Sequence, residues 1–259
     1  MPEGDTVWRA ARAQHAALAG QVLERSDLRV PRFATADLSG ETVHEVVARG
    51  KHLLHRIGDL TLHTHLKMEG RWTAMPRGDR WPRPAHEARV VLETTTTQAV
   101  GFSLGIVELV PTAEEDRVVG HLGPDILGPD WDAARAVANL EADAERPAFV
   151  AVLDQRNLAG LGNVYANELL FLRGIDPHRP VREVADVPAL VDLASRLILA
   201  NRDRSMRITT GDSRPGARTW VYGRGGRPCR RCGTRIRRGE LGADELSERI
   251  ITWCPSCQG

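Results

Sequence analysis

The 259-residue chain lacks any long hydrophobic run. None of its apolar stretches approaches the ~20 residues that a helix needs to cross a bilayer, and its start is acidic where a signal peptide is basic. The apolar fraction of 42% and the charged fraction of 27% suit a globular protein, and the length allows two domains, each with its own core. We therefore expect a cytoplasmic protein without a membrane partner.

Cysteine is scarce, and its spacing is informative. The chain has four cysteines, arranged as Cys229-x-x-Cys232 and Cys254-x-x-Cys257 with 21 residues between the pairs. Disulfides are rare in a reducing cytoplasm, whereas paired cysteines at this spacing are typical of a tetrahedral zinc site. Four sulfur ligands leave no position for water, so the pattern predicts one structural Zn²⁺ that holds a β-hairpin with its tip around residues 248–250.

Lysine is nearly absent, although the chain has 35 basic residues. The two lysines are Lys51 and Lys67, and in an arginine-rich protein they mark places where a compact ammonium group is favoured. The formal net charge is only +1, but residues 201–240 contain 12 arginines and three acidic residues. A cationic segment of this density favours a polyanion such as nucleic acid, the alternative being a solvated tail.

The pattern of elements changes near residue 110. Residues 3–19 have the apolar spacing of a helix that ends at Gly20. Short alternating runs then predict strands of a β-sandwich or barrel over residues 21–30, 41–48, 52–57, 60–66, 89–94, 98–102 and 106–110, interrupted by a surface loop over 75–87. Beyond Pro111, helices are expected near residues 113–121, 131–142, 147–154, 163–173 and 188–200. The chain is thus predicted to be α+β with two domains.

Residues 1–4 can form a nucleophile. A small residue after Met1 generally permits its removal, which leaves a secondary amine on Pro2. A terminal amine titrates near pH ~8, so much of it is neutral and able to attack an aldehyde carbon, and the proline adduct is a cationic iminium. Glu3 stands beside it as an acid/base. Taken alone, the same residues also fit an ordinary exposed helix start.

A glycine-rich turn precedes the helix expected at 163–173. Gly160 and Gly162 allow the backbone to approach a ligand closely, and a helix that starts at Asn163 offers unpaired N–H groups and a positive dipole end. This arrangement suits a phosphate. A tight turn between two helices with Asn163 as its cap is the alternative.

Seven motifs lie along the chain, at residues 2–4, 49–54, 65–70, 121–125, 160–168, 221–224 and 253–258. Together they resemble the formamidopyrimidine-DNA glycosylase and endonuclease VIII family of base-excision repair enzymes, closest to its endonuclease VIII-like branch. The resemblance covers nearly the whole chain. It implies an N-terminal helix with an antiparallel β-sandwich, a helix-two-turns-helix motif and a C-terminal zinc finger. The corresponding boundaries are a catalytic domain at 1–110, a hinge at 111–130, a DNA-binding domain at 131–222 and the finger at 223–259.

The resemblance also implies roles for individual residues. Pro2 is expected to be the nucleophile at the sugar C1′, with Glu3 as acid/base and Lys51 at the lesion phosphate. Asn163 and Arg249 are expected to hold the DNA backbone. Met68 matches the apolar wedge that fills the gap left by an everted base, next to Lys67. For His65 the resemblance leaves open whether it is functional or an ordinary strand histidine.

Two departures from the family pattern bear on activity. Thr6 stands where the family usually has a second glutamate, and residues 100–105 lack the Asp-Pro-Arg-Arg-Phe-Gly signature of enzymes for oxidised purines. We therefore expect a monomeric glycosylase and AP lyase that acts on damaged DNA and favours oxidised pyrimidines. The alternatives are an oxidised-purine or hydantoin glycosylase of the same family, and a non-catalytic zinc-finger protein that binds damaged DNA.

Overall fold

The computed structural model describes residues 2–259, with only the backbone described for residue 246, and it divides into two compact units after His121. Met1, whose removal would free the Pro2 amine, lies outside the described residues. The division falls within the segment 111–130 for which a hinge is predicted; the finer domain boundaries stay predictions. In residues 2–259 no helix is both long enough and apolar enough to cross a membrane.

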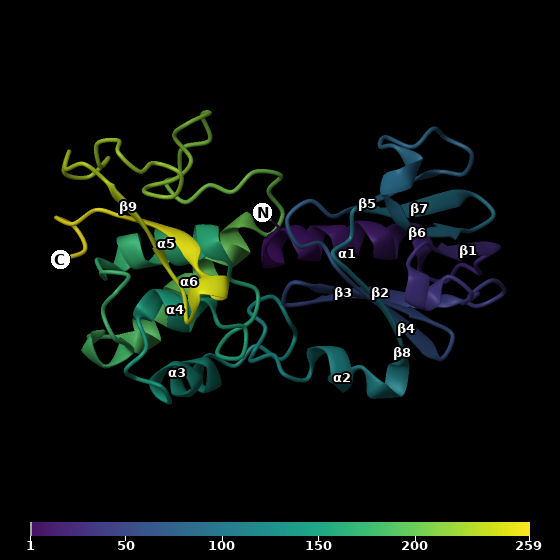
Figure 1. Cartoon of the computed structure of the whole chain (residues 1–259), viewed down its shortest axis with the longest axis horizontal. Coiled ribbons are helices and arrows are strands. Elements are labelled where there is room, and N and C mark those ends of the chain that lie inside the picture. Colours follow the sequence, from purple (N-terminus) through teal and green to yellow (C-terminus); the bar gives the residue numbers. More distant parts are fainter. Residues whose placement is uncertain (1) are drawn as a thin grey trace. The chain divides into compact units, whose positions relative to one another are not determined.

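Unit 1 is built on two four-stranded sheets, as expected for a sandwich (Figure 1). The first has the order β1-β6-β7-β5 and comprises β1 (Arg25–Leu28), β5 (Arg71–Pro76), β6 (Ala88–Glu93) and β7 (Thr97–Phe102). The second has the order β2-β3-β4-β8 and comprises β2 (Val43–Arg49), β3 (His52–Ile57), β4 (Leu60–His65) and β8 (Ile106–Pro111). All pairings between these strands are antiparallel.

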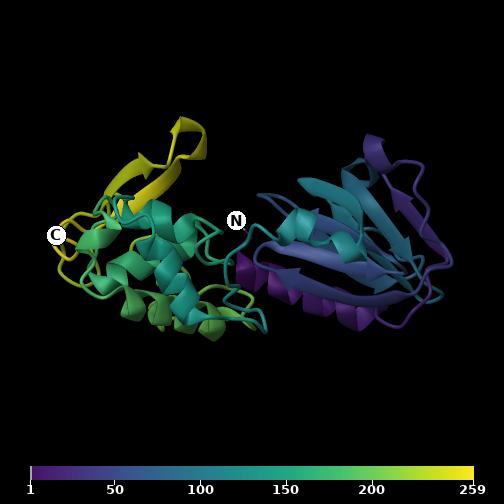
Figure 2. The same ribbon diagram turned by 90° about the horizontal axis from the view of Figure 1, so that it is seen from below.

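Helix α1 (Gly4–Leu18) lies along the sandwich (Figure 2). Its buried residues Val7, Ala11, Gln14 and Leu18 recur every three or four positions, so they form one face of the helix. That face contacts β2 and β3 of one sheet and β5 and β7 of the other. The helix start, with Pro2 and Glu3 before it, is thereby held in place by a buried core.

Short elements complete unit 1. The helix expected at 113–121 is split into the 3-10 turn η3 (Thr112–Glu114) and α2 (Asp116–Val119). The expected loop at 75–87 begins inside β5 and ends in the 3-10 turn η2 (Ala85–Glu87). Between them the segment is fixed from β7, because Gln98 accepts from Trp81 Nε1 (3.0 Å) and donates to the Asp79 carbonyl (2.7 Å). A further 3-10 turn, η1 (Pro31–Phe33), follows β1.

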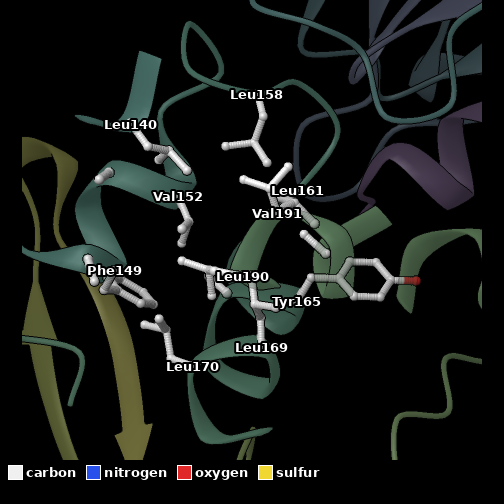
Figure 3. Packing of buried hydrophobic residues seen from close by; sticks show 14 of the residues in the cluster. Leu140, Phe149, Val152, Leu158, Leu161, Tyr165, Leu169, Leu170, Leu190 and Val191 are labelled. Atoms are coloured by element: carbon white, nitrogen blue, oxygen red, sulfur yellow. The ribbon is translucent and has the colours of Figure 1, made fainter. Parts of the chain in front are cut away.

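Unit 2 is a helical cluster around α5 (Asn163–Arg173), whose residues 163–171 are all buried. The other helices are α3 (Ala133–Glu141), α4 (Ala148–Leu153) and α6 (Val187–Asn201), together with the 3-10 turn η4 (Val181–Glu183). Phe149, Leu161, Leu169 and Leu190 pack together in the core, and the Tyr165 ring joins them with its hydroxyl pointing away (Figure 3). The apolar face of each helix is thus covered by its neighbours.

A two-stranded hairpin completes unit 2 (Figure 2). It is formed by β9 (Arg237–Leu241) and β10 (Arg249–Trp253), joined by a loop that contains the 3-10 turn η5 (Glu245–Ser247). Arg249 pairs with Leu241, so residues 249 and 250 begin β10 and the tip of the hairpin is the loop before them. The expected tip at 248–250 therefore lies a few residues too late. Strand β10 packs against α5.

Candidate active site and nucleic-acid interface

Pro2 and Glu3 lie directly before α1. Glu3 is the N-cap residue in an extended conformation, and its carbonyl accepts from the N–H groups of Thr6 (2.9 Å) and Val7 (3.0 Å). The Glu3 side chain is fully buried, whereas Pro2 is half-buried. The unpaired N–H groups and the positive dipole of a helix start favour a carboxylate at this place. A buried acid thus stands next to the residue that would carry the amine.

The side chain of Thr6 is tied to a second buried carboxylate. Asp5 is fully buried, and its Oδ1 accepts from the Thr6 N–H (2.7 Å) and the Thr6 hydroxyl (3.3 Å). Arg9 completes the group with Nη1 3.6 Å from Asp5 Oδ2 and with a hydrogen bond from Nη2 to Thr6 Oγ1 (3.3 Å). Although position 6 lacks the family's usual glutamate, the first turn of α1 still has a buried carboxylate. It belongs to Asp5, to which the sequence analysis gave no role in the site.

Lys51 lies at the tip of the hairpin that joins β2 and β3. Arg49 pairs with His52, so the connection has two residues, Gly50 and Lys51. The first residue of such a loop must adopt a positive φ, and Gly50 has φ +58°. The glycine before Lys51 is therefore required by the turn, and the turn sets where the ammonium group is presented.

The next cationic group lies on the connection that follows β4. The backbone N–H of Lys67 donates to Nδ1 of His65 (2.9 Å), although Lys67 itself has a left-handed φ of +50°. Burial, followed by the charges of Lys67 and Lys51, lowers the pKa of His65 to about 4. Since Nδ1 is occupied as an acceptor, neutral His65 carries its proton on Nε2 and can donate to an anion. Both lysines thus act on one strand histidine.

Met68 is presented by this same turn. Its side chain is 65% exposed, the largest exposed fraction among the exposed large apolar residues that the structure describes. The turn is closed by a hydrogen bond from Gly70 N–H to the Leu66 carbonyl (2.8 Å). The Lys67 side chain of this turn also packs closely against Gly105, where an added Cβ would lie 2.2 Å from it. An exposed methionine on a well-supported turn is suited to insertion into a partner.

In unit 2, Asn163 begins α5 after the glycine-rich turn. Gly160 has φ +106°, a conformation that side chains rarely adopt, and Gly162 is the N-cap. Asn163 is 7% exposed and accepts at Oδ1 from Nδ2 of Asn167 (3.1 Å). Asn167 Oδ1 in turn accepts from the backbone N–H of Thr252 in β10 (2.6 Å). Asn167 therefore connects the helix start to the strand that Arg249 begins, a link that sequence reasoning missed.

The arginine-rich segment contains a buried anchor. Glu168 is fully buried, and its carboxylate accepts from the backbone N–H groups of Trp220 (2.7 Å), Val221 (2.8 Å) and Tyr222 (2.8 Å) and from the Thr209 hydroxyl. Burial raises the pKa of Glu168 against these hydrogen bonds. One carboxylate thus closes the loop between residues 209 and 220, which presents the exposed side chain of Arg214.

Some arginines of this segment have structural roles. Arg224 is buried and donates to the carbonyls of Trp220 and, at 2.8 Å, Pro228. The Arg231 guanidinium lies 4.5 Å from the centre of the Phe171 ring. The count of 12 arginines therefore overstates the positive charge that is available to a polyanion.

The four cysteines converge as their spacing predicts. Their sulfur atoms all lie within 4.8 Å of one another, with Cys232 Sγ 3.5 Å from both Cys254 Sγ and Cys257 Sγ. Four sulfurs at ~2.3 Å from one metal ion would be about 3.8 Å apart, so the donor set fits a tetrahedral centre. Within residues 2–259 this is the one group of three or more potential ligands close enough to hold a metal ion.

Together these features describe a two-unit protein whose β-sandwich carries a proline at a helix start and whose helical unit carries a glycine-rich helix start and a four-cysteine hairpin. The model of the formamidopyrimidine-DNA glycosylase N-terminal domain matches residues 1–103, and that of the formamidopyrimidine-DNA glycosylase H2TH domain matches residues 122–197. The chain belongs to the formamidopyrimidine-DNA glycosylase family.

Full-length relatives and solved structures agree with this assignment. The chain is 56% identical to the probable endonuclease 8 2 of Streptomyces coelicolor, over 100% of this chain and 94% of the relative. It is 50% identical to the DNA-(apurinic or apyrimidinic site) lyase Nei2 of Mycolicibacterium smegmatis, over 100% and 99% of the two chains. A structure of MutM in complex with carbocyclic 8-oxo-G containing DNA has the same fold, with a TM-score of 0.81, 23% identity and full coverage of both chains.

Proposed function

We propose that this protein is a base-excision repair DNA glycosylase with AP lyase activity that removes oxidised bases, with oxidised pyrimidines as the favoured substrates. The observation that carries the proposal is Pro2, placed directly before α1 and next to the buried carboxylate of Glu3. The names of the full-length relatives, which describe endonuclease 8 enzymes and an AP lyase, support it.

The reaction begins at the Pro2 nitrogen once Met1 has been removed. Its lone pair attacks C1′ of an everted nucleotide, and the damaged base leaves with the electrons of the glycosidic bond and takes up a proton. The Pro2 nitrogen then gives up its own proton, and its regained lone pair opens the C1′–O4′ bond as Glu3 protonates O4′, which gives a cationic iminium between proline and sugar. Loss of the C2′ proton expels the 3′ phosphate, and loss of the C4′ proton expels the 5′ phosphate. Water finally releases the sugar fragment and restores the amine.

The remaining residues hold the DNA. Lys51, Lys67, Asn163 and Arg249 contact the phosphates around the lesion, and Met68 fills the space of the everted base. His65 joins the phosphate contacts, since its Nε2–H is a donor near both lysines. Because most of these contacts are to phosphates, affinity falls steeply as salt increases.

A structural zinc ion stabilises the hairpin β9–β10. Cys229, Cys232, Cys254 and Cys257 would be its ligands, and four thiolates leave no position for a reacting water. The metal therefore supplies folding energy and no chemistry. None of the four cysteines is disulfide-bonded, as expected in a reducing cytoplasm, and we propose that the protein works there as a monomer.

The preference for pyrimidines rests on the connection between β7 and β8. It has only three residues, Ser103, Leu104 and Gly105, and Gly105 packs against Lys67. Such a short connection offers no chain that could enter the DNA opposite the lesion. Excision of oxidised purines or hydantoins is the alternative within the same chemistry. A non-catalytic damage-binding protein is the alternative that Thr6 leaves open.

Borohydride trapping tests the proposal. The test is specific because the sequence has two lysines whose amines could also be trapped, and both can be replaced. The double variant Lys51→Arg, Lys67→Arg leaves the terminal amine as the only amine in the chain. With duplexes that carry an oxidised pyrimidine, an oxoguanine, a hydantoin or an abasic site, we expect this variant to form a covalent adduct on Pro2. Adduct yield across the panel ranks the lesions.

Two controls complete the experiment. Protein shown by intact mass to retain Met1 should bind the duplexes without forming an adduct on Pro2, because its Pro2 nitrogen is a tertiary amide. Glu3→Gln should retain the amine and lose most of the strand cleavage. Binding of wild-type protein without adduct or nicking would refute the glycosylase and leave the damage-binding alternative.

A further inference from the structure

His65, which lies on β4 next to Lys51 and Lys67, belongs to a cluster of imidazoles whose other members have no role in the chemistry or the DNA contacts described above. Those members are His52 on β3, His63 on β4 and His121, the last residue of unit 1. The rings of His63 and His65 are each centred 5.0 Å from the ring of His52, and the ring of His121 is centred 6.0 Å from it. Within residues 2–259 the cysteine group is the one set of side chains whose geometry suits a metal ion, so the contacts among these imidazoles are read as hydrogen bonds and ring packing.

Three of the side chains form a hydrogen-bonded series. Glu108 on β8 is the cross-strand partner of His63, and its Oε2 lies 2.9 Å from His63 Nδ1. His63 Nε2 lies 2.7 Å from His52 Nδ1. A carboxylate can only accept, so His63 carries its proton on Nδ1 and accepts at Nε2, and His52 must donate from its own Nδ1. The series therefore sets one tautomer for both rings.

The series ends against the residue that supports the Met68 turn. His52 is the cross-strand partner of His65, and the two rings meet edge to face. His65 Nδ1 accepts a hydrogen bond from the backbone N–H of Lys67. Lys67 is the non-glycine residue of this turn that has a left-handed φ. A residue in that region costs free energy and persists only where its surroundings hold it. The orientation of the His65 ring therefore matters for the turn.

We propose that Glu108, His63 and His52 are positioning residues that fix the His65 ring and thereby hold the Lys67–Met68 turn in the shape that inserts Met68 into DNA. This inference rests on the proposed function only for its consequence in catalysis. The hydrogen-bonded series is a property of unit 1 in the absence of DNA.

The rings are neutral at physiological pH, as the series requires. Burial, the neighbouring His63, His65 and His121, and then Lys67 lower the pKa of His52 to about 3. Burial lowers the pKa of His63, against the opposing effect of Glu108. Because the imidazoles are neutral, their hydrogen bonds and ring contacts can fix the orientations of the rings without adding positive charge beside the two lysines.

The tautomers can be read directly by NMR of ¹⁵N-histidine-labelled full-length protein. Neutral histidine in water favours a proton on Nε2, so Nδ1–H signals from both His52 and His63 are a specific expectation. In Glu108→Leu the His52 signal should change to Nε2–H. In Glu108→Gln both signals should stay, because the amide oxygen still accepts from His63.

Catalysis supplies the second measurement. Base excision needs the wedge to hold a base out of the helix, whereas an abasic site has no base to displace. Glu108→Leu should therefore lower the ratio of base excision to abasic-site cleavage on the order of tenfold, and Glu108→Gln should restore it. Glu114→Leu, which removes an exposed carboxylate of η3, is the matched control and should leave the ratio unchanged.

The outcomes separate this inference from the proposed function. An Nε2–H tautomer of His52 in wild-type protein overturns the series without any variant. Equal losses of excision and abasic-site cleavage in Glu108→Leu would mean a merely structural role and also overturn it. A wild-type protein that cleaves neither substrate refutes the proposed function, and the tautomers then still decide whether the series exists.

Discussion

Acid should destabilise unit 1 through His55. This residue lies on β3, is completely buried, and packs against the Trp72 ring with the ring centres 4.6 Å apart. Burial lowers its pKa from 6.5 to about 3. Between these values the unfolded chain binds a proton that the folded chain does not, so the free energy of unfolding falls as the pH drops through this window.

The size of the effect follows from the shift. Each pH unit inside the window changes the free energy of unfolding by about 1.4 kcal/mol for one such histidine. Between pH 7 and pH 5, His55 alone should therefore remove about 2 kcal/mol. His52, with a pKa of about 3, and His65, with a pKa of about 4, act in the same direction. The loss is large against a typical total of about 5–15 kcal/mol.

Native-state hydrogen exchange with mass spectrometry can isolate this effect in the full-length chain. Peptides from β3 and β4 report the opening free energy of unit 1 separately from the cysteine hairpin, which also responds to acid. His55→Leu should remove about 2 kcal/mol of the loss between pH 7 and pH 5, since leucine fills the site without titrating. His86→Leu, a change at an exposed histidine, is the control. Equal acid losses in His55→Leu and wild type would refute the reasoning.

Three further outcomes are expected. Met68→Ala should lower base excision more than abasic-site cleavage in single-turnover assays and change stability by less than about 0.5 kcal/mol, because the side chain is 65% exposed; a large loss of stability would mean that it is a packing residue. Glu168→Ala should destabilise unit 2 by about 3 kcal/mol in urea unfolding and make residues 209–222 the first site of limited proteolysis, since it leaves buried N–H groups unpaired; cleavage elsewhere would contradict this. A chelator should weaken DNA binding, measured by fluorescence anisotropy, while trapping on Pro2 at saturating DNA persists and added zinc restores affinity; unchanged affinity would rule out a role for the finger.

Local signals predicted most of the elements. The helix expected at 163–173 is observed as Asn163–Arg173, because glycines define both of its ends and Gly174 adopts the left-handed φ of +69° that closes it. The strand expected at 52–57 is observed with those bounds. The α-helix expected at 113–121 begins instead as the 3-10 turn η3. The tip of the β9–β10 hairpin was predicted a few residues too late in the sequence. In both places the connection folds into short turns that apolar spacing does not reveal.

The candidate site was predictable where its chemistry is local. Two closely spaced pairs of cysteines predict that all four side chains meet at one site, as observed. A proline directly after the initiating methionine is likewise visible in the first residues. Asn167 and Glu168 could not be assigned roles in the same way. They adjoin the glycine-rich motif, but their partners are 85 and 52–54 residues away along the chain, at Thr252 and at residues 220–222.

The sequence by itself determined which groups are proposed to react and which cysteines are proposed to bind a metal ion, because capping, turns and ligand spacing act within a few residues. The tertiary structure decided which side chains meet. Glu108 reaches His63, 45 residues away, only because β8 pairs with β4 in one register, and a shift of one residue would turn Glu108 to the other face of the sheet. The buried Glu3 and Asp5 likewise depend on the packing of α1 against both sheets. Strand register and helix packing are set by the whole core, which no short motif encodes.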